Sequence, residues 1–313
     1  MTSIEDVTRL SASLGPRALR RTLGRIRSSE TAVGLAFLSP ALLSLLFLRI
    51  YPTISAISAS FHHASLLLGT SSRWVGLDNY RFLVHSPAFA RSVLTTLEFV
   101  AVTVAIQTVL ALGIAVLFTQ GVRGERLWRS LVFLPTTIPI AVSTVVWGIA
   151  FRPDGVLNAV LGALGIARQP FLTSSQQALL SIVVLVSWVG VGYWTIFLIA
   201  GLREIPTEYR EAAAVDGAGP MKTFFGIVLP LLRRPLVFVV VANTIANFLV
   251  FAPSQILTRG GPDNATRVIL FDIYSQAYQV GDRGLASAEI VLFLILLLAI
   301  VAAQFRFLLR HSG

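Results

Sequence analysis

Cysteine is absent from this chain of 313 residues, and charged residues are scarce. The first absence excludes disulfide bonds, thiolate metal ligands and a cysteine nucleophile. Charged residues make up 13% of the chain, against roughly 25% in a typical soluble domain. The four histidines lack partners at a spacing that suits a metal ion, and no nucleophile is paired with a base. We therefore expect neither a metal site nor enzymatic activity.

Lysine occurs only once, as Lys222 directly after Met221. A Walker A phosphate loop needs a Gly-Lys-Ser/Thr ending, and this lysine lies in a different context. The chain therefore carries no visible nucleotide site, and we expect it to bind no cofactor of its own.

Apolar residues are abundant, at 55% of the sequence with a mean hydropathy of +0.77. Several continuous apolar runs are long enough to cross a bilayer core about 30 Å thick. The pattern predicts an all-α, polytopic membrane protein with six transmembrane helices. We expect these at about residues 31–58, 93–118, 131–151, 178–202, 236–256 and 286–305.

The distribution of basic residues predicts the orientation of these spans. Residues 1–30 form a polar tail with six arginines, ahead of a single transmembrane domain at 31–313. The tail is interpreted equally well as a helix on the inner leaflet or as a disordered segment. With six spans, both termini share one side, which collects 16 Lys and Arg residues against 8 on the other. The positive-inside tendency makes the first side cytoplasmic, so the net charge of +10 needs no nucleic-acid partner.

A polar loop at 203–234 separates the fourth and fifth predicted spans and contains EAAAVDGAGPMKTFFGIVLP at 211–230. We predict two short helices around a turn, the first over 206–216 with Glu208 and Glu211 near its start, where the helix dipole favours anions. Gly217 permits the turn and Pro220 suits the first turn of the second helix. Pro230 and Pro235 are expected to end that helix.

The spacing of this loop resembles the EAA signature of binding-protein-dependent ABC importer permeases. Further phrases resemble the carbohydrate-uptake (maltose and glycerol-phosphate) branch of that family, and the last two are more similar to the first, "A/F"-like, permease of each pair. The phrases are LSPALLSLLFLRIYP at 38–52, VGLDNY at 75–80, FLPTTIP at 133–139, DGVLNAVLGALG at 154–165 and LTRGGPDNAT at 257–266. The chain lacks the extra spans of the maltose type and is more similar to the six-span members.

The resemblance implies that the loop is a cytoplasmic coupling element. Its first helix would dock on a separate ATPase, which holds the ATP and Mg²⁺, with Glu211 facing a basic residue there. The resemblance also implies a second homologous permease, two ATPase copies, an extracytoplasmic solute-binding lipoprotein and a bacterial plasma (inner) membrane location, in contact with membrane lipid. The coupling residues that match the signature are Glu211, Ala212, Ala213, Gly217, Ile227, Leu229 and Pro230.

Some polar and aromatic side chains inside the apolar spans are suited to contact a sugar on its way through the membrane. We single out Trp147, Tyr193, Trp194, Asn243 and Asn247, the last two on one helix face. Interfacial anchoring or helix–helix bridging would explain these residue types equally well. Glu98 and Glu289 are expected near the outer ends of their spans, in a boundary role.

The function predicted is import of a sugar or sugar-like solute by an ATP-driven complex. Glycerol phosphate or its diesters would use the same mechanism. An ion-coupled secondary transporter is the alternative of another class, although such carriers usually place acidic groups at mid-membrane. The sequence does not choose between a neutral and an anionic solute.

Overall fold

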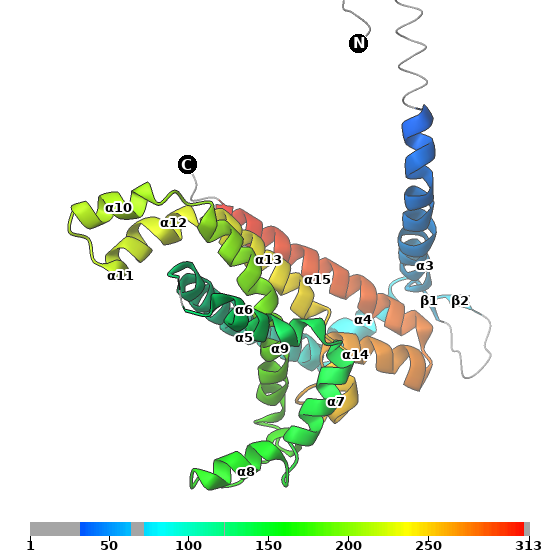
Figure 1. The fold of residues 1–313 in the computed structure, drawn as a ribbon. Coiled ribbons are helices and arrows are strands. Elements are labelled where there is room, and N and C mark those ends of the chain that lie inside the picture. Colours follow the sequence, from blue (N-terminus) through cyan, green and yellow to red (C-terminus); the bar gives the residue numbers. More distant parts are fainter. Residues whose placement is uncertain (1–31, 64–71, 122, 310–313) are drawn as a thin grey trace, which may run out of the picture. The chain divides into compact units, whose positions relative to one another are not determined.

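The computed structural model describes residues 32–63, 72–121 and 123–309, and the chain divides into two units, Met1–Ser58 and Ala59–Gly313. The predicted basic tail lies outside the described residues. Within them the regular secondary structure is almost entirely helical (Figure 1). The exception is a short antiparallel pair, β1 (His62–His63) and β2 (Arg73–Trp74).

The first unit consists, in its described part, of one apolar helix that continues to Ala59. It contains a π-helical turn, η1 (Leu46–Ile50), followed by α3 (Tyr51–Ala59). Pro52 falls in the first turn of α3, directly after the π-helical turn. Proline has no backbone N–H to donate, so it lies where the regular hydrogen-bond pattern of the helix is already interrupted. The helix agrees with the first predicted span.

The second unit is built around three long apolar helices, α5 (Pro87–Thr119), α9 (Ala178–Arg203) and α15 (Arg283–Leu309). A short helix, α4 (Asp78–His85), precedes α5. Ser86 caps α5 because its hydroxyl accepts the Phe89 N–H at 3.3 Å, and Pro87 occupies the first turn. The helices confirm the second, fourth and sixth predicted spans, and α5 and α15 are longer than predicted.

The third predicted span is not one continuous helix. It consists of α6 (Glu125–Phe133), the 3₁₀ turn η2 (Leu134–Thr137) and α7 (Ile140–Ala150), and the two halves meet at 98°. Pro135 and Pro139 lie at the break, where each removes a backbone donor that a straight helix would use. The following loop contains α8 (Val156–Ala163) and η3 (Phe171–Thr173), neither of which the sequence analysis anticipated.

The segment after α9 forms two arms and a bend. The first arm is α10 (Glu208–Val215), and the second runs through α11 (Pro220–Thr223), η4 (Phe224–Val228) and α12 (Leu229–Leu231). It meets α13 (Arg233–Phe248) at 70°. The second arm ends at Leu231, one residue after Pro230, which agrees with the prediction for that proline. The prediction for Pro235 was wrong, because this proline lies in the first turn of α13 rather than at the end of the arm.

The predicted fifth span is also shorter than expected, because α13 ends at Phe248 rather than near residue 256. An irregular stretch follows, with η5 (Ser254–Thr258), α14 (Ile269–Tyr274) and η6 (Ser275–Val280) before α15. In the described residues, four helices are long and apolar enough to cross a membrane, or six if each bent pair is one span. The all-α, polytopic prediction is confirmed.

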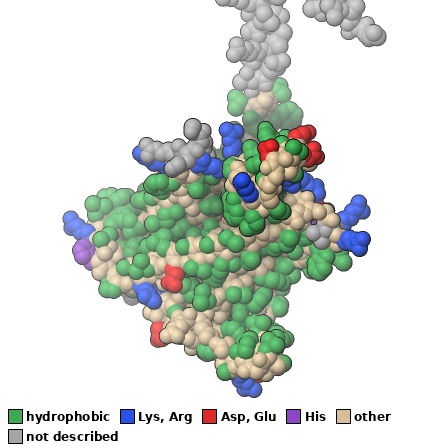
Figure 2. Space-filling view, turned by 90° about the vertical axis from the view of Figure 1, so that its left-hand side faces the viewer, with side chains coloured by type: hydrophobic (Ala, Val, Ile, Leu, Met, Phe, Trp, Pro, Cys, Tyr) green, Lys and Arg blue, Asp and Glu red, His purple; other side chains and the backbone are tan. Residues whose placement is uncertain are grey.

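The core of the second unit lies mainly between α5, α9 and α13. One cluster contains Phe99, Ile182, Leu185 and Phe248, all almost inaccessible to solvent. Figure 2 shows hydrophobic side chains over most of the middle of the face in view, with Lys and Arg gathered mostly toward its edges. This distribution is expected where the solvent of a helix surface is lipid.

Charged side chains inside the second unit are few and grouped. The buried acid Asp272 accepts hydrogen bonds from Arg267, and Glu289 interacts electrostatically with both. Glu289 lies near the start of α15, as expected, but it is only 1% exposed, so the boundary role expected of it is wrong. It faces the protein because α14 packs against α15 at this level. Glu98, by contrast, is exposed on α5.

Candidate functional site

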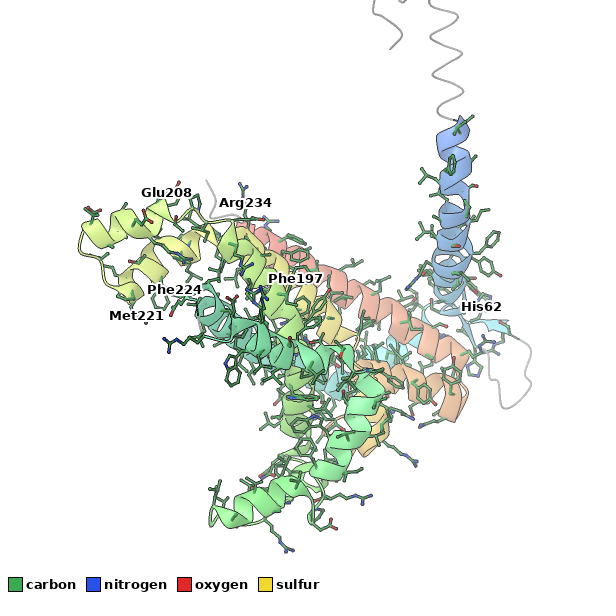
Figure 3. The ribbon with its side chains drawn as sticks, in the orientation of Figure 1. His62, Phe197, Glu208, Met221, Phe224 and Arg234 are labelled. Atoms are coloured by element: carbon green, nitrogen blue, oxygen red, sulfur yellow. The ribbon has the colours of Figure 1, made fainter. Side chains whose placement is uncertain are left out.

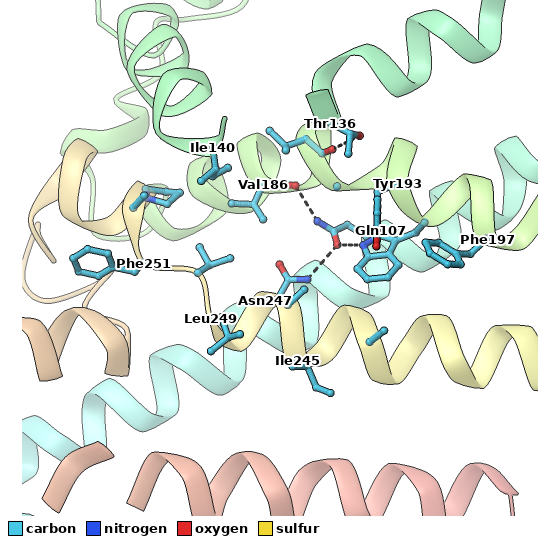
Figure 4. A pocket seen from close by; sticks show the side chains of 18 of the residues that line it. Gln107, Thr136, Ile140, Val186, Tyr193, Phe197, Ile245, Asn247, Leu249 and Phe251 are labelled. Atoms are coloured by element: carbon cyan, nitrogen blue, oxygen red, sulfur yellow. Dashed lines mark hydrogen bonds between the residues drawn. The ribbon is translucent and has the colours of Figure 1, made fainter. Parts of the chain in front are cut away.

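A cavity of about 770 Å³ opens between α5, η2, α7, α9 and the end of α13 (Figure 4). Its wall is mostly apolar, with a small number of convergent polar groups, as in many small-molecule sites. The lining residues are Gln107, Thr136, Ile140, Val186, Val189, Gly190, Tyr193, Trp194, Phe197, Phe238, Ala242, Ile245, Ala246, Asn247, Leu249, Val250, Phe251, Ala252 and Pro253.

The side-chain amide of Gln107 is the centre of the polar groups in the cavity wall. Its Nε2 donates to the backbone carbonyl of Val186 at 2.9 Å. Its Oε1 accepts from Trp194 Nε1 and from Asn247 Nδ2, both at 3.2 Å. One amide therefore joins α5, α9 and α13 at a buried point. Buried amides of this kind are stable only when their partners are present.

Gly190 makes room for this amide on α9. A Cβ atom at residue 190 would lie 2.6 Å from Gln107 Nε2 and 3.0 Å from its Cδ. Any larger side chain would push the amide away from the carbonyl to which it donates. Two residues further along, a Cβ at Gly192 would lie 2.2 Å from the carbonyl oxygen of Val132, so this glycine lets α6 approach α9.

Aromatic rings form the wall next to the Gln107 amide. Tyr193 lies edge-on to Trp194, with centroids 4.9 Å apart, and Phe197 lies 5.1 Å from Tyr193 and 5.6 Å from Phe238. Tyr193 is 44% exposed, and its hydroxyl makes no hydrogen bond within the described part of the chain. Trp194 is buried, and its single side-chain N–H donates a hydrogen bond to Gln107.

The cavity lies deep along the helices that form it. Trp194 precedes the end of α9 by nine residues, Gln107 precedes the end of α5 by twelve, and Asn247 follows the start of α13 by fourteen. At a rise of 1.5 Å per residue these separations are about 14–21 Å. The polar centre is therefore near the middle of a hydrocarbon core about 30 Å thick.

The structure brings together some of the residues singled out from the sequence. Tyr193, Trp194 and Asn247 line the cavity. Asn243 lies behind them, fully buried, and its Oδ1 accepts from Asn247 Nδ2 at 2.6 Å. Trp147 is not among the lining residues, because it packs instead against Phe151 and Trp188 with centroids 5.2 and 5.6 Å away.

Gln107 is the residue that sequence reasoning passed over. It is visible as a polar residue inside an apolar run, but its partners lie 79 to 140 residues away in the chain. Phe197 and Phe238 were missed because phenylalanines are common throughout the spans.

The loop at 203–234 forms a second candidate site, a hairpin that projects from the ends of α9 and α13 (Figure 3). Glu208 and Glu211 lie in the first turn of α10, as predicted. Glu211 is exposed, and no salt bridge is made to it by another described residue. Gly217 has a φ of +74°, which places the turn in a conformation that favours glycine.

The alanines of the hairpin do not all face outward. Ala212 is exposed, whereas Ala213 is 4% exposed and packs into its own chain. Ala213 therefore contributes to packing within the chain. Ile227 and Leu229 are half-buried on the second arm, and Pro230 is exposed. Val215 and Met221 expose apolar side chains near the turn.

One hydrophobic cluster runs from the hairpin to the cavity. It contains Val228 of η4, Leu232 at the bend, Leu202 and Leu198 of α9, and Trp194 in the cavity wall. Leu198 and Leu232 are inaccessible to solvent. The cluster is a continuous set of packed side chains between the hairpin and the cavity wall. Across the described residues, no group of three or more His, Cys, Asp or Glu is placed to hold a metal ion.

Comparison with known proteins gives one family. The family described as "Binding-protein-dependent transport system inner membrane component" matches residues 107–312. A sn-glycerol-3-phosphate transport system permease protein UgpA of Pectobacterium atrosepticum is 32% identical over 273 residues, covering 87% of this chain and 92% of that protein. The probable ABC transporter permease protein YesP of Bacillus subtilis is 31% identical over 281 residues, covering 88% and 90%.

A solved structure shares the fold. A chain from a bacterial ABC transporter involved in the import of the acidic polysaccharide alginate superposes with a TM-score of 0.80 at 21% identity. The match covers 94% of this chain and all of that chain. At this identity the likeness shows the arrangement of the helices alone.

Proposed function

The chain belongs to the family of inner membrane components of binding-protein-dependent transport systems, and we propose that it is one of two permease subunits in an ATP-driven importer of a sugar or sugar-like solute. It is a transport component that spans the membrane several times, not an enzyme. The cavity between α5, α9 and α13 would be this subunit's part of the solute pathway. The α10–α12 hairpin would be its contact with an ATPase.

The observation that carries the proposal is the cluster from Val228 to Trp194. It connects an exposed polar hairpin with a cavity wall through side chains that are almost all buried. Coupling between distant sites needs such a physically contiguous element. The hairpin also joins α9 to α13 directly in sequence, and both helices supply cavity residues. Movement of the hairpin would therefore shift two walls of the cavity together.

The mechanism follows from this connection. Binding of ATP and Mg²⁺ would close two copies of a separate ATPase and draw the two permease hairpins together. The motion would tilt α9 and α13 and expose the cavity to the outer side, where a solute-binding protein releases its ligand. Hydrolysis would restore the inward-facing arrangement. Both termini and the hairpin would then lie on the cytoplasmic side of the plasma membrane of a bacterium.

Glu211 would supply the charged contact to the ATPase. It is exposed in the first turn of α10, and the neighbouring Ala212 offers no bulk that would keep a partner away. A charge-assisted hydrogen bond of this kind contributes about 1.5–3 kcal/mol. Gly217 would hold the turn, while Ile227, Leu229 and Pro230 would support the second arm.

The names of the curated relatives make glycerol phosphate an alternative solute for the same mechanism. In either case Tyr193, Trp194 and Asn247 would face the solute. Asn243 would position Asn247 from behind, and Trp147 would support the wall through Trp188.

The test is ATPase activity of the complex purified from native membranes through a tag on this chain and placed in lipid nanodiscs. We expect Glu211→Lys to reduce both the amount of ATPase retained and the stimulation by solute-loaded binding protein. Glu204→Lys makes the same charge change on an exposed residue outside α10 and should retain both. Undiminished association and stimulation in Glu211→Lys would contradict the coupling role.

A further inference from the structure

We infer that the solute passing through this cavity is uncharged, a neutral glycoside rather than a phosphorylated or carboxylated one. The inference rests on the proposed function and specifies the chemistry of the same cavity. It comes from two observations on the cavity wall: the described lining has no charged side chain, and some of its polar groups have no partner among the described residues.

The residues that line the cavity include no Lys, Arg, His, Asp or Glu. The charged residues inside the second unit are found elsewhere. Arg267, Asp272 and Glu289 interact with one another, and Glu98 is exposed on α5. None of these four belongs to the wall. The described part of the cavity wall therefore has no charged side chain that could pair with a charged solute.

An anionic solute would be poorly accommodated in such a wall. A phosphate monoester carries about −1.5 to −2 charges at pH 7. Taking an ion out of water into mostly apolar surroundings is strongly unfavourable unless it is paired. Proteins that bind phosphate or carboxylate usually supply Arg or Lys for this reason. A neutral sugar loses only hydroxyl hydration, which amide and hydroxyl groups can replace.

The wall does supply such groups. The hydroxyl of Tyr193 has no hydrogen-bond partner among the described residues, and Tyr193 is 44% exposed. The side-chain oxygen of Asn247 makes no hydrogen bond there either, whereas its nitrogen is held by Asn243 and Gln107. The ring of Phe197 lies next to Tyr193, with centroids 5.1 Å apart (Figure 4), and the ring of Phe238 lies 5.6 Å from that of Phe197. Free hydroxyl and amide groups beside ring faces suit the hydroxyl edge and the C–H face of a sugar.

The experiment places one charge of either sign in the wall. Ala246 of α13 lines the cavity and is exposed, so Ala246→Lys, Ala246→Glu and the uncharged Ala246→Gln differ mainly in charge. Each variant would be assembled into the full complex with its binding protein in proteoliposomes. ATP-driven uptake would be measured for radiolabelled sucrose, maltose, trehalose and lactose, and for sn-glycerol 3-phosphate and glucose 6-phosphate.

For a neutral solute we expect uptake of at least one disaccharide and of neither phosphate, with the Lys and Glu variants within a few fold of each other. An anionic solute a few ångströms from the new charge would make uptake by Ala246→Lys exceed that by Ala246→Glu by on the order of tenfold or more. That result, or phosphate uptake by the unmodified complex, would overturn the inference and leave the importer intact. Uptake of no probe at all would contradict the proposed function itself.

Discussion

The contact between Gly190 and Gln107 provides a direct test of the cavity's architecture. Replacing Gly190 by alanine adds a Cβ that would lie 2.6 Å from Gln107 Nε2 and 3.2 Å from its Oε1. The amide must rotate or move, and it then loses its hydrogen bonds to Val186, Trp194 and Asn247. We therefore expect one added methyl group to weaken both the fold and the solute site.

The magnitude follows from the contacts. Inserting a methyl group into a close-packed interior costs typically about 1–3 kcal/mol. Leaving a buried amide partner without its hydrogen bond costs about 1–3 kcal/mol per group. Part of this is recovered because the glutamine side chain is flexible, so we expect a total of about 2 kcal/mol. For a chain of 313 residues, with an unfolding entropy of about 2.1 cal/mol/K per residue, this lowers the midpoint of thermal unfolding by about 3 °C.

The assay is a double-mutant cycle on thermal unfolding of the purified complex. Gln107→Ala removes the amide that the new methyl group would strike, so Gly190→Ala should cost little more in that background. Neighbouring residues that interact in this way show non-additivity of about 0.5–3 kcal/mol. Gly113→Ala is the matched control, since a Cβ there meets nothing within 4 Å in α5, and it should be neutral or stabilising. Strictly additive costs of the two cavity substitutions would refute the reasoning.

Three further predictions concern other parts of the second unit. Gly192→Ala places a Cβ 2.2 Å from a backbone carbonyl oxygen of α6, so we expect little folded complex on size-exclusion chromatography; normal recovery would show that α6 does not approach α9 this closely. Arg267→Met leaves the buried Asp272 without its cation at a cost of about 3–5 kcal/mol, and adding Asp272→Leu should restore most of the thermal midpoint; a double variant as unstable as the single one would contradict this. Gly217→Ala forces a φ of +74° on alanine, which costs about 1–2 kcal/mol, and should reduce solute-stimulated ATPase activity. Gly219→Ala is the control, because Gly219 has an ordinary φ of −67°, and it should leave this activity unchanged. Equal effects of the two substitutions would count against a turn that depends on Gly217.

Local patterns in the sequence predicted the helices well. Continuous apolar runs placed α5, α9 and α15 because lipid accepts apolar side chains on every face, so the run itself is the signal. The turn at Gly217 and the acids at the start of α10 followed from backbone and dipole preferences of single residues.

Proline was the main source of error. Pro135 and Pro139 were placed within one span, although the structure bends there by 98°. Pro235 was expected to end a helix but lies in the first turn of α13. A proline interrupts hydrogen bonds toward its N-terminal side, so the same residue suits a helix start or a bend. Which one occurs depends on packing that is not local.

Long-range contacts set the cavity and could not be predicted from the sequence. The Gln107 amide joins three helices that are far apart in the chain. Trp147 and Trp194 are the same residue type in similar apolar surroundings, yet only Trp194 lines the cavity. Glu289 is buried because α14 packs against α15. No apolar run in the sequence predicted α14, so this burial could not be predicted either.

The most direct test of the central claim is uptake of the transported solute into proteoliposomes under defined energy sources. The full complex, with its binding protein outside and ATP and Mg²⁺ inside, should accumulate solute, and uptake should stop when either ATP or the binding protein is withheld. Replacing ATP by a proton or sodium gradient should give no accumulation. Accumulation by this chain alone, driven by an ion gradient without ATP, would contradict the account and identify an ion-coupled carrier.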